Sequence, residues 1–67
     1  MKAATGLLTQ RIRQEFDEVP GLQITLEEGV RFWALDVETC AKILGELHQL
    51  GFLVQTSEGR YRRAPVI

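Results

Sequence analysis

The chain has 67 residues, of which 45% are hydrophobic and 25% are charged, with a formal net charge of −1. This length provides apolar side chains for one core, which excludes a large enzyme and predicts one domain over residues 1–67. Cys40 is the only cysteine and His48 the only histidine, which excludes an intrachain disulfide and a zinc site with four Cys and His ligands. Apolar runs fall far short of the roughly 20 residues that span a bilayer, so we expect a cytoplasmic protein outside membranes.

The charges are distributed unevenly along the chain. Residues 1–13 and residues 59–67 each carry three basic residues and no acid, and all nine acids lie between them. The basic residues of the two ends are Lys2, Arg11, Arg13, Arg60, Arg62 and Arg63. If the two ends meet in the fold, a basic face would lie beside an acidic one.

The first predicted element is an amphipathic helix with an apolar stripe at i, i+4 and i+8. The stripe consists of Leu8, Ile12 and Phe16. We expect the helix to begin after Thr5 or Gly6 and to end near Glu18, because Pro20 disfavours helical geometry at the residue before it. Residues 22–24 alternate apolar and polar, which predicts a brief strand or extended linker.

Two further helices are predicted by their caps. Thr25 and Glu28 have the spacing of a capping box, so a short second helix begins there. Its inner stripe is Leu26, Val30 and Trp33. Asp36 is an N-cap for a third helix, and Gly51 is suited to a left-handed C-cap. The third helix has the strongest apolar stripe of the chain, formed by Val37, Cys40, Ile43, Leu44 and Leu47.

The last predicted element is a β-hairpin. Residues 52–56 have the composition of a strand, Gly59 supplies a turn, and residues 60–63 can pair back as a second strand. Pro65 then blocks further pairing. Three helices followed by a hairpin predict a small α+β fold.

The order of these elements and their residues resemble the winged helix superfamily. Residues 25–53 look like the helix-turn-helix of bacterial transcription regulators, including the cyclic-AMP receptor type. In that family the recognition helix has the form x-E-T-V-x-R-x-L-x-x-L-x-x-x-G-[LF]-[IL] and leads into the wing. The matching residues are Glu38, Thr39, Leu44, Leu47, Gly51, Phe52 and Leu53, with Lys42 in place of the arginine and Cys40 in place of the valine. The resemblance implies a helix-turn-helix over about 25–51 and a wing over about 52–63.

The resemblance further implies a transcriptional regulator that binds double-stranded DNA, with the third helix in the major groove. On its outer face Glu38 can accept a hydrogen bond from cytosine N4, and Thr39 can bond a phosphate or touch a thymine methyl. Lys42 can reach guanine or phosphate. The expected backbone contacts are Arg60, Arg62 and Arg63 on the wing and Arg11 and Arg13 on the first helix. Gly29 replaces a core leucine or isoleucine of the family, which is expected to soften the second helix by up to about 1 kcal/mol.

A second hypothesis is a winged helix that serves as a protein interaction module and has lost DNA binding. The low net charge favours this hypothesis, as does Val37 where the family often has a polar base-reading residue. Phe32 fits either the core or an exposed partner patch. Because the sequence has no glycine-rich phosphate loop, paired catalytic carboxylates or metal-ligand spacing, we expect neither catalysis nor a cofactor.

A homodimer is the last expectation from the sequence. Regulators of this type commonly place two recognition helices about one DNA turn apart. The apolar residues left unexplained by the core and the DNA face are Leu7, Val66 and Ile67. We expect these residues at or near the contact between two copies.

Overall fold

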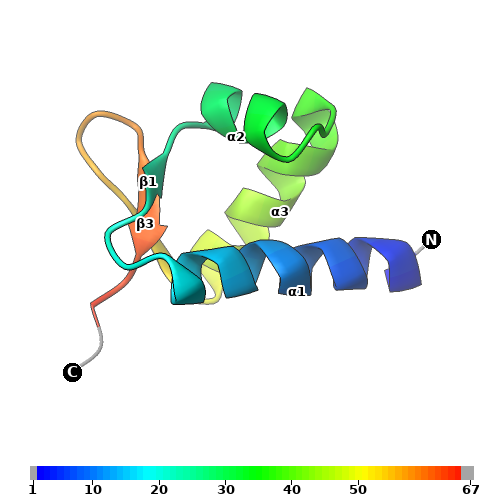
Figure 1. Cartoon of the computed structure of the whole chain (residues 1–67), viewed down its shortest axis with the longest axis horizontal. Helices are drawn as coiled ribbons and strands as arrows, with labels where there is room; N and C mark the ends of the chain where they lie inside the picture. Colours follow the sequence, from blue (N-terminus) through cyan, green and yellow to red (C-terminus); the bar gives the residue numbers. More distant parts are fainter. Residues whose placement is uncertain (1, 66–67) are drawn as a thin grey trace.

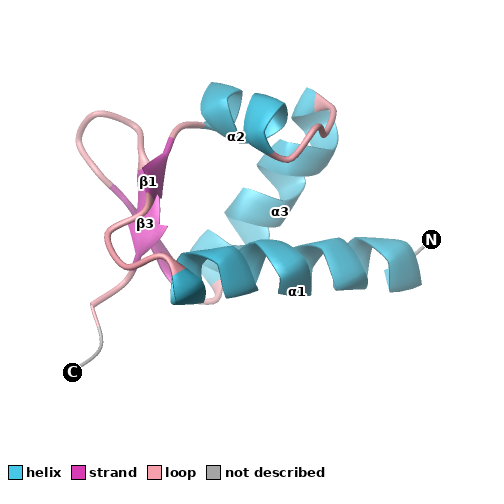
Figure 2. Cartoon of the chain, viewed as in Figure 1, coloured by secondary structure: helices cyan, strands magenta, loops and turns pink. Residues whose placement is uncertain are grey.

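The computed structural model describes the backbone of residues 2–65 and the side chains of residues 6–65. Within this range the protein has three helices and a three-stranded antiparallel sheet, which confirms the small α+β class (Figures 1 and 2). The elements are α1 (Lys2–Glu18), β1 (Gln23–Ile24), α2 (Leu26–Phe32), α3 (Val37–Gln49), β2 (Leu53–Gln55) and β3 (Tyr61–Arg63). In Figure 1, α1 runs along one side of the molecule, α2 and α3 pack across from it, and the sheet closes one end.

The sheet has the order β1-β3-β2, so β1, the brief strand predicted at residues 22–24, forms one edge and β2 forms the other. Tyr61 of β3 lies opposite Ile24 and Gln55, while Arg62 lies opposite Gln23 and Val54. Directly opposed residues share a face of a sheet, and successive residues alternate between faces. Tyr61 therefore lies on the face of the buried Ile24, and Arg62 lies on the other face.

The core is formed mainly by one face of α3, joined by α1 and the sheet. Its buried residues are Ile12, Phe16, Ile24, Cys40, Ile43, Leu44, Leu47 and Leu53. The apolar stripes predicted for the first and third helices are confirmed by this set, except that Leu8 is only partly buried against the core and Val37 is 58% exposed. Cys40 is a core residue, and burial raises the pKa of its thiol, with a further rise from the negative charge of Asp36. A thiol with a raised pKa is a poor nucleophile, as suits a small core side chain.

The helix ends differ from the expectations in two places. α1 begins at Lys2 rather than after Thr5 or Gly6, because Ala3 and Ala4 are strong helix formers and extend it. α2 ends at Phe32, so Trp33 is its C-cap, but Trp33 still packs against the core with Leu26 and Val30, as the predicted stripe requires. The turn that follows is made by Ala34 at φ +54°, a conformation that alanine adopts at a cost.

The C-terminus of α3 has the predicted left-handed glycine. Gly51 has φ +81°, and its N–H donates to the carbonyl of His48 at 3.1 Å. The N–H of Phe52 donates to the carbonyl of Leu47 at 3.0 Å, which closes the last turn. The chain therefore reverses at Gly51 and enters β2 without leaving these α3 carbonyls unpaired.

Both predicted N-caps are also confirmed. Thr25 Oγ1 accepts from the N–H of Glu28 at 3.1 Å, and Glu28 Oε1 accepts from the N–H of Thr25 at 3.0 Å. At α3, Asp36 Oδ2 accepts from the N–H of Thr39 at 3.0 Å, and Asp36 Oδ1 accepts from its hydroxyl at 2.7 Å. These bonds to Thr39, the backbone bond first, lower the pKa of Asp36 below its ordinary value of 3.8.

The cap of α3 predicts a pH-dependent contribution to stability. Because the pKa of Asp36 is lower in the folded protein, its carboxylate stabilises the fold above pH 3.8 and loses this contribution as the pH falls through the folded pKa. Asp36→Asn keeps a capping oxygen but removes the charge. At about pH 6, urea titration should give a higher free energy of unfolding for the original protein than for the variant. At about pH 3 this difference should be smaller. A difference that is equal at both pH values would contradict this assignment.

Candidate nucleic-acid interface

The outer face of α3 is exposed but carries more acid than base. The exposed residues of α3 are Val37, Glu38, Ala41, Lys42, Glu46, His48 and Gln49, of which His48 lies against the ring of Tyr61. Negative side chains in the first turn of a helix are favourable for its dipole, but they repel phosphates. Lys42 is the only basic residue on this face, so a nucleic acid would meet a single cation there.

Thr39 lies at the border of this face and is half-buried. Its hydroxyl proton is donated to Asp36 at 2.7 Å, so the side chain has no second proton to give. A phosphate oxygen accepts hydrogen bonds only, and Thr39 could bind one only by giving up its bond in the cap. While the cap is intact, Thr39 cannot bond a phosphate, but it can still contact a thymine methyl.

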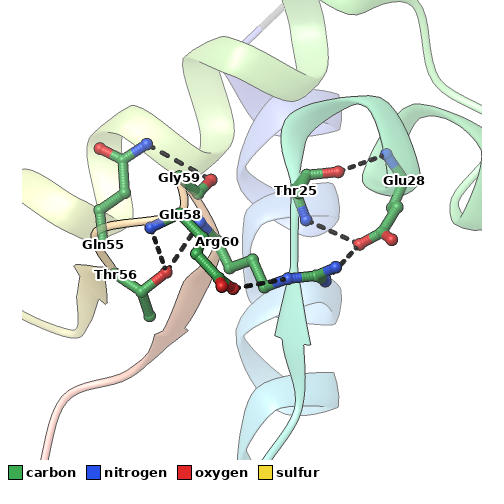
Figure 3. Close-up of polar contacts among 7 residues, drawn as sticks. All are labelled: Thr25, Glu28, Gln55, Thr56, Glu58, Gly59 and Arg60. Atoms are coloured by element: carbon green, nitrogen blue, oxygen red, sulfur yellow. Dashed lines mark hydrogen bonds and ion pairs between the residues drawn. The ribbon is translucent and has the colours of Figure 1, made fainter.

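The loop between β2 and β3 is held by its own hydrogen bonds (Figure 3). Thr56 Oγ1 accepts from the N–H groups of Glu58 at 3.3 Å and Arg60 at 3.1 Å. The N–H of Thr56 donates to the carbonyl of Arg60 at 2.8 Å, and Gly59 makes the reversal at φ +83°. These hydrogen bonds therefore fix the conformation of the loop of residues 56–60.

Arg60 joins this loop to the N-terminus of α2 (Figure 3). Its Nη1 donates to Glu28 Oε1 at 3.0 Å, the oxygen that also accepts from the N–H of Thr25. Its Nε lies 3.8 Å from Glu58 Oε1. The pKa of Glu28 is lowered first by the backbone bond from Thr25 and then by the charge of Arg60. A phosphate at Arg60 would have to compete with both carboxylates.

Arg13 and Arg63 gather at the opposite end of β3, over the ring of Phe52. The guanidinium carbons lie 4.8 Å and 4.6 Å from the ring centroid, which is the geometry of cation–π contacts. Arg63 Nε is also 3.1 Å from Asp17 Oδ1, an ion pair without hydrogen-bond geometry at that nitrogen. The two basic ends of the chain therefore meet, as the charge pattern suggested, but they meet beside an acid and away from the loop of residues 56–60.

Four of the expected basic contacts form no ion pair with another described residue: Arg11, Arg13, Lys42 and Arg62. Arg62 lies on the outer face of the sheet, Lys42 on α3 and Arg11 on α1. The eight expected site residues thus lie in five places: α3, the loop of residues 56–60, the outer face of the sheet, α1, and the group of Arg13 and Arg63 over Phe52, here called the Phe52 cluster. Sequence reasoning missed Glu28 and Asp17 as partners of the arginines, because no local spacing links residues so far apart in the chain.

The remaining expectations concern exposed apolar residues and other sites. Phe32 is 61% exposed and Leu7 68% exposed, while Val66 and Ile67 lie outside the described residues. Among the side chains that the structure describes, no group of three His, Cys, Asp or Glu residues could hold a metal ion. Within residues 2–65, no helix combines the length and apolar character needed to cross a bilayer. Comparisons with protein-family models, curated proteins and solved structures found no match to this chain.

Proposed function

We propose that the chain is a winged helix protein that binds duplex DNA, with α3 in the major groove and the loop of residues 56–60 as the wing. The observation that carries the proposal is the arrangement of the elements. The order α1-β1-α2-α3-β2-β3 with β3 at the centre of the sheet supports it, as does the bond that ties Arg60 of the wing to Glu28 of α2. A regulator of transcription is the function that this geometry supports best.

The outer face of α3 is suited to close approach. B-DNA's major groove, about 12 Å wide, admits a helix when its outer side chains are not too bulky. Ala41 is exposed, and a Cβ at Gly45 would meet nothing within 4 Å. Lys42 and Glu38 then extend toward base edges, where lysine can donate to guanine O6 and N7 and glutamate can accept from cytosine N4.

The sheet beside the wing contributes sequence-independent affinity through Arg62 of β3, which has no internal counter-ion among the described residues. Each phosphate neutralised changes the slope of log K against log salt by about −0.9. Arg62→Ala should therefore make the slope less negative by about 0.9, measured by fluorescence anisotropy with a duplex of random sequence. Arg63→Ala is the matched control, because Arg63 is already paired with Asp17 and should leave the slope unchanged. Equal slopes for Arg62→Ala and the original protein would contradict this role.

A specific observation favours a second function, a protein interaction module without DNA binding. Arg60 and Arg63 are already paired with acids of the same chain, and the outer face of α3 is acidic. A surface with few unpaired cations releases few counterions from DNA, so its affinity for DNA gains little from that release. This function predicts no binding to duplex DNA even at low salt, which separates it from the first.

A further inference from the structure

A groove of about 330 Å³ lies between α1 and the end of α2, away from α3's outer face and the wing. Its lining residues are Leu8, Arg11, Ile12, Glu15, Phe32 and Trp33. Phe32 packs edge-on against Trp33 with ring centroids 5.8 Å apart, yet 61% of Phe32 is exposed. Leu7, beside Leu8, is 68% exposed. Apolar side chains of this size gathered at one groove mark a site where another molecule is bound.

The groove also contains a buried donor with no acceptor. Trp33 Nε1 is shielded from solvent, and no described group accepts its proton. Buried indole N–H groups normally find a partner, because an unpaired one loses its bond to water without replacement. The groove is therefore incomplete in the single chain in its apolar cover, since Phe32 beside Trp33 remains exposed.

The charges at the groove indicate what covers it. Arg11 and Glu15 are one helical turn apart on α1, and neither forms an ion pair with another described residue. An inverted copy of α1, related by a two-fold axis near residue 13, would set Arg11 opposite Glu15 and Glu15 opposite Arg11. In an isologous interface the same patch of both copies meets across a two-fold axis, so the patch must be complementary to itself.

We propose that a second copy of this chain occupies the groove, with the two α1 helices antiparallel. Arg11 of each copy pairs with Glu15 of the other, and Phe32 and Leu7 of both copies are covered. The inference does not rest on DNA binding, because it uses neither α3's outer face nor the wing. A dimer that ignores DNA and a monomer that binds DNA are therefore distinguishable results.

The test uses charge reversal and mixing, read out by sedimentation equilibrium over a concentration series. The original protein should rise from the mass of one chain, 7.6 kDa, toward twice that mass. Arg11→Glu alone sets Glu against Glu15, and Glu15→Arg alone sets Arg against Arg11, so each should weaken the dimer by about tenfold or more. An equimolar mixture of the two variants restores both attractive pairs and should dimerise better than either variant alone.

The double variant R11E/E15R provides the matched control, since it exchanges the charges within each copy and should regain dimerisation. The emission of Trp33, the only tryptophan, gives an independent signal that should shift to shorter wavelength as the groove is covered. An original protein that stays monomeric at every concentration would overturn the proposal. So would a mixture that associates no more tightly than its separate components.

Discussion

Leu44→Ala is expected to lower the free energy of unfolding by about 2–5 kcal/mol, the range for a buried leucine that leaves a cavity. Leu44 is fully buried on the core face of α3. At roughly 0.05–0.15 kcal/mol per residue, a domain of this size has a total stability of only about 3–10 kcal/mol. The variant should therefore lose a large share of its stability and unfold at a markedly lower urea concentration, as measured by urea titration followed by circular dichroism.

The matched control for this substitution is Leu50→Ala, which removes the same atoms from a side chain that is 75% exposed. Substitutions at exposed positions usually change stability by less than about 0.5 kcal/mol. Similar losses for the two variants would mean that Leu44 is not the core residue described above.

Gly29→Ala is expected to destabilise the protein by about 1–3 kcal/mol, the typical cost of overpacking. A Cβ at Gly29 would lie 2.8 Å from Cζ3 of Trp33 and 3.1 Å from Sγ of Cys40. The better helix propensity of alanine returns at most about 1 kcal/mol. Trp33 is a rigid ring that also packs on Phe16, with centroids 6.1 Å apart, so it has little freedom to move away.

Gly45→Ala is the control, because it makes the same change inside α3 where nothing lies within 4 Å of the new Cβ. With no clash, the gain in helix propensity should stabilise the protein by about 0.5–1 kcal/mol. The two glycines should thus respond with opposite signs in thermal unfolding. If both variants were stabilised, the close packing of Trp33 over α2 would be wrong.

Gly29 also shows where sequence reasoning reached its limit. The sequence led us to expect a missing core side chain in the second helix. In the structure the absence of a side chain is what lets Trp33 and Cys40 approach the backbone of α2. The position is therefore determined by close packing against Trp33 and Cys40 rather than by helix propensity alone.

The features that were predicted well are those that depend on residues close together in the sequence. The capping box of Thr25 and Glu28, the Asp36 cap and the Gly51 reversal each depend on residues within a few positions of one another. The turn at Ala34 was not predictable in this way, since alanine has no preference for positive φ.

The candidate site was harder to predict than the fold, because it depends on ion pairs between distant residues. Simple alternation along residues 60–63 separates Arg62 from Tyr61, as the register of β3 shows. It contained no information on Glu28 or Asp17, which engage Arg60 and Arg63. The net charge at the proposed interface therefore follows from tertiary contacts rather than from the charge pattern of the chain.

Binding of the original protein to a duplex of random sequence, measured by fluorescence anisotropy between about 50 mM and about 200 mM salt, tests the proposed function most directly. With Lys42 and Arg62 as the unpaired cations of α3 and the sheet, we predict measurable affinity at low salt and a log–log slope of about −1 to −2. Over this fourfold range of salt the affinity should fall by about 4- to 16-fold. No binding at the lowest salt, or an affinity that does not change with salt, would contradict DNA binding and favour the interaction module.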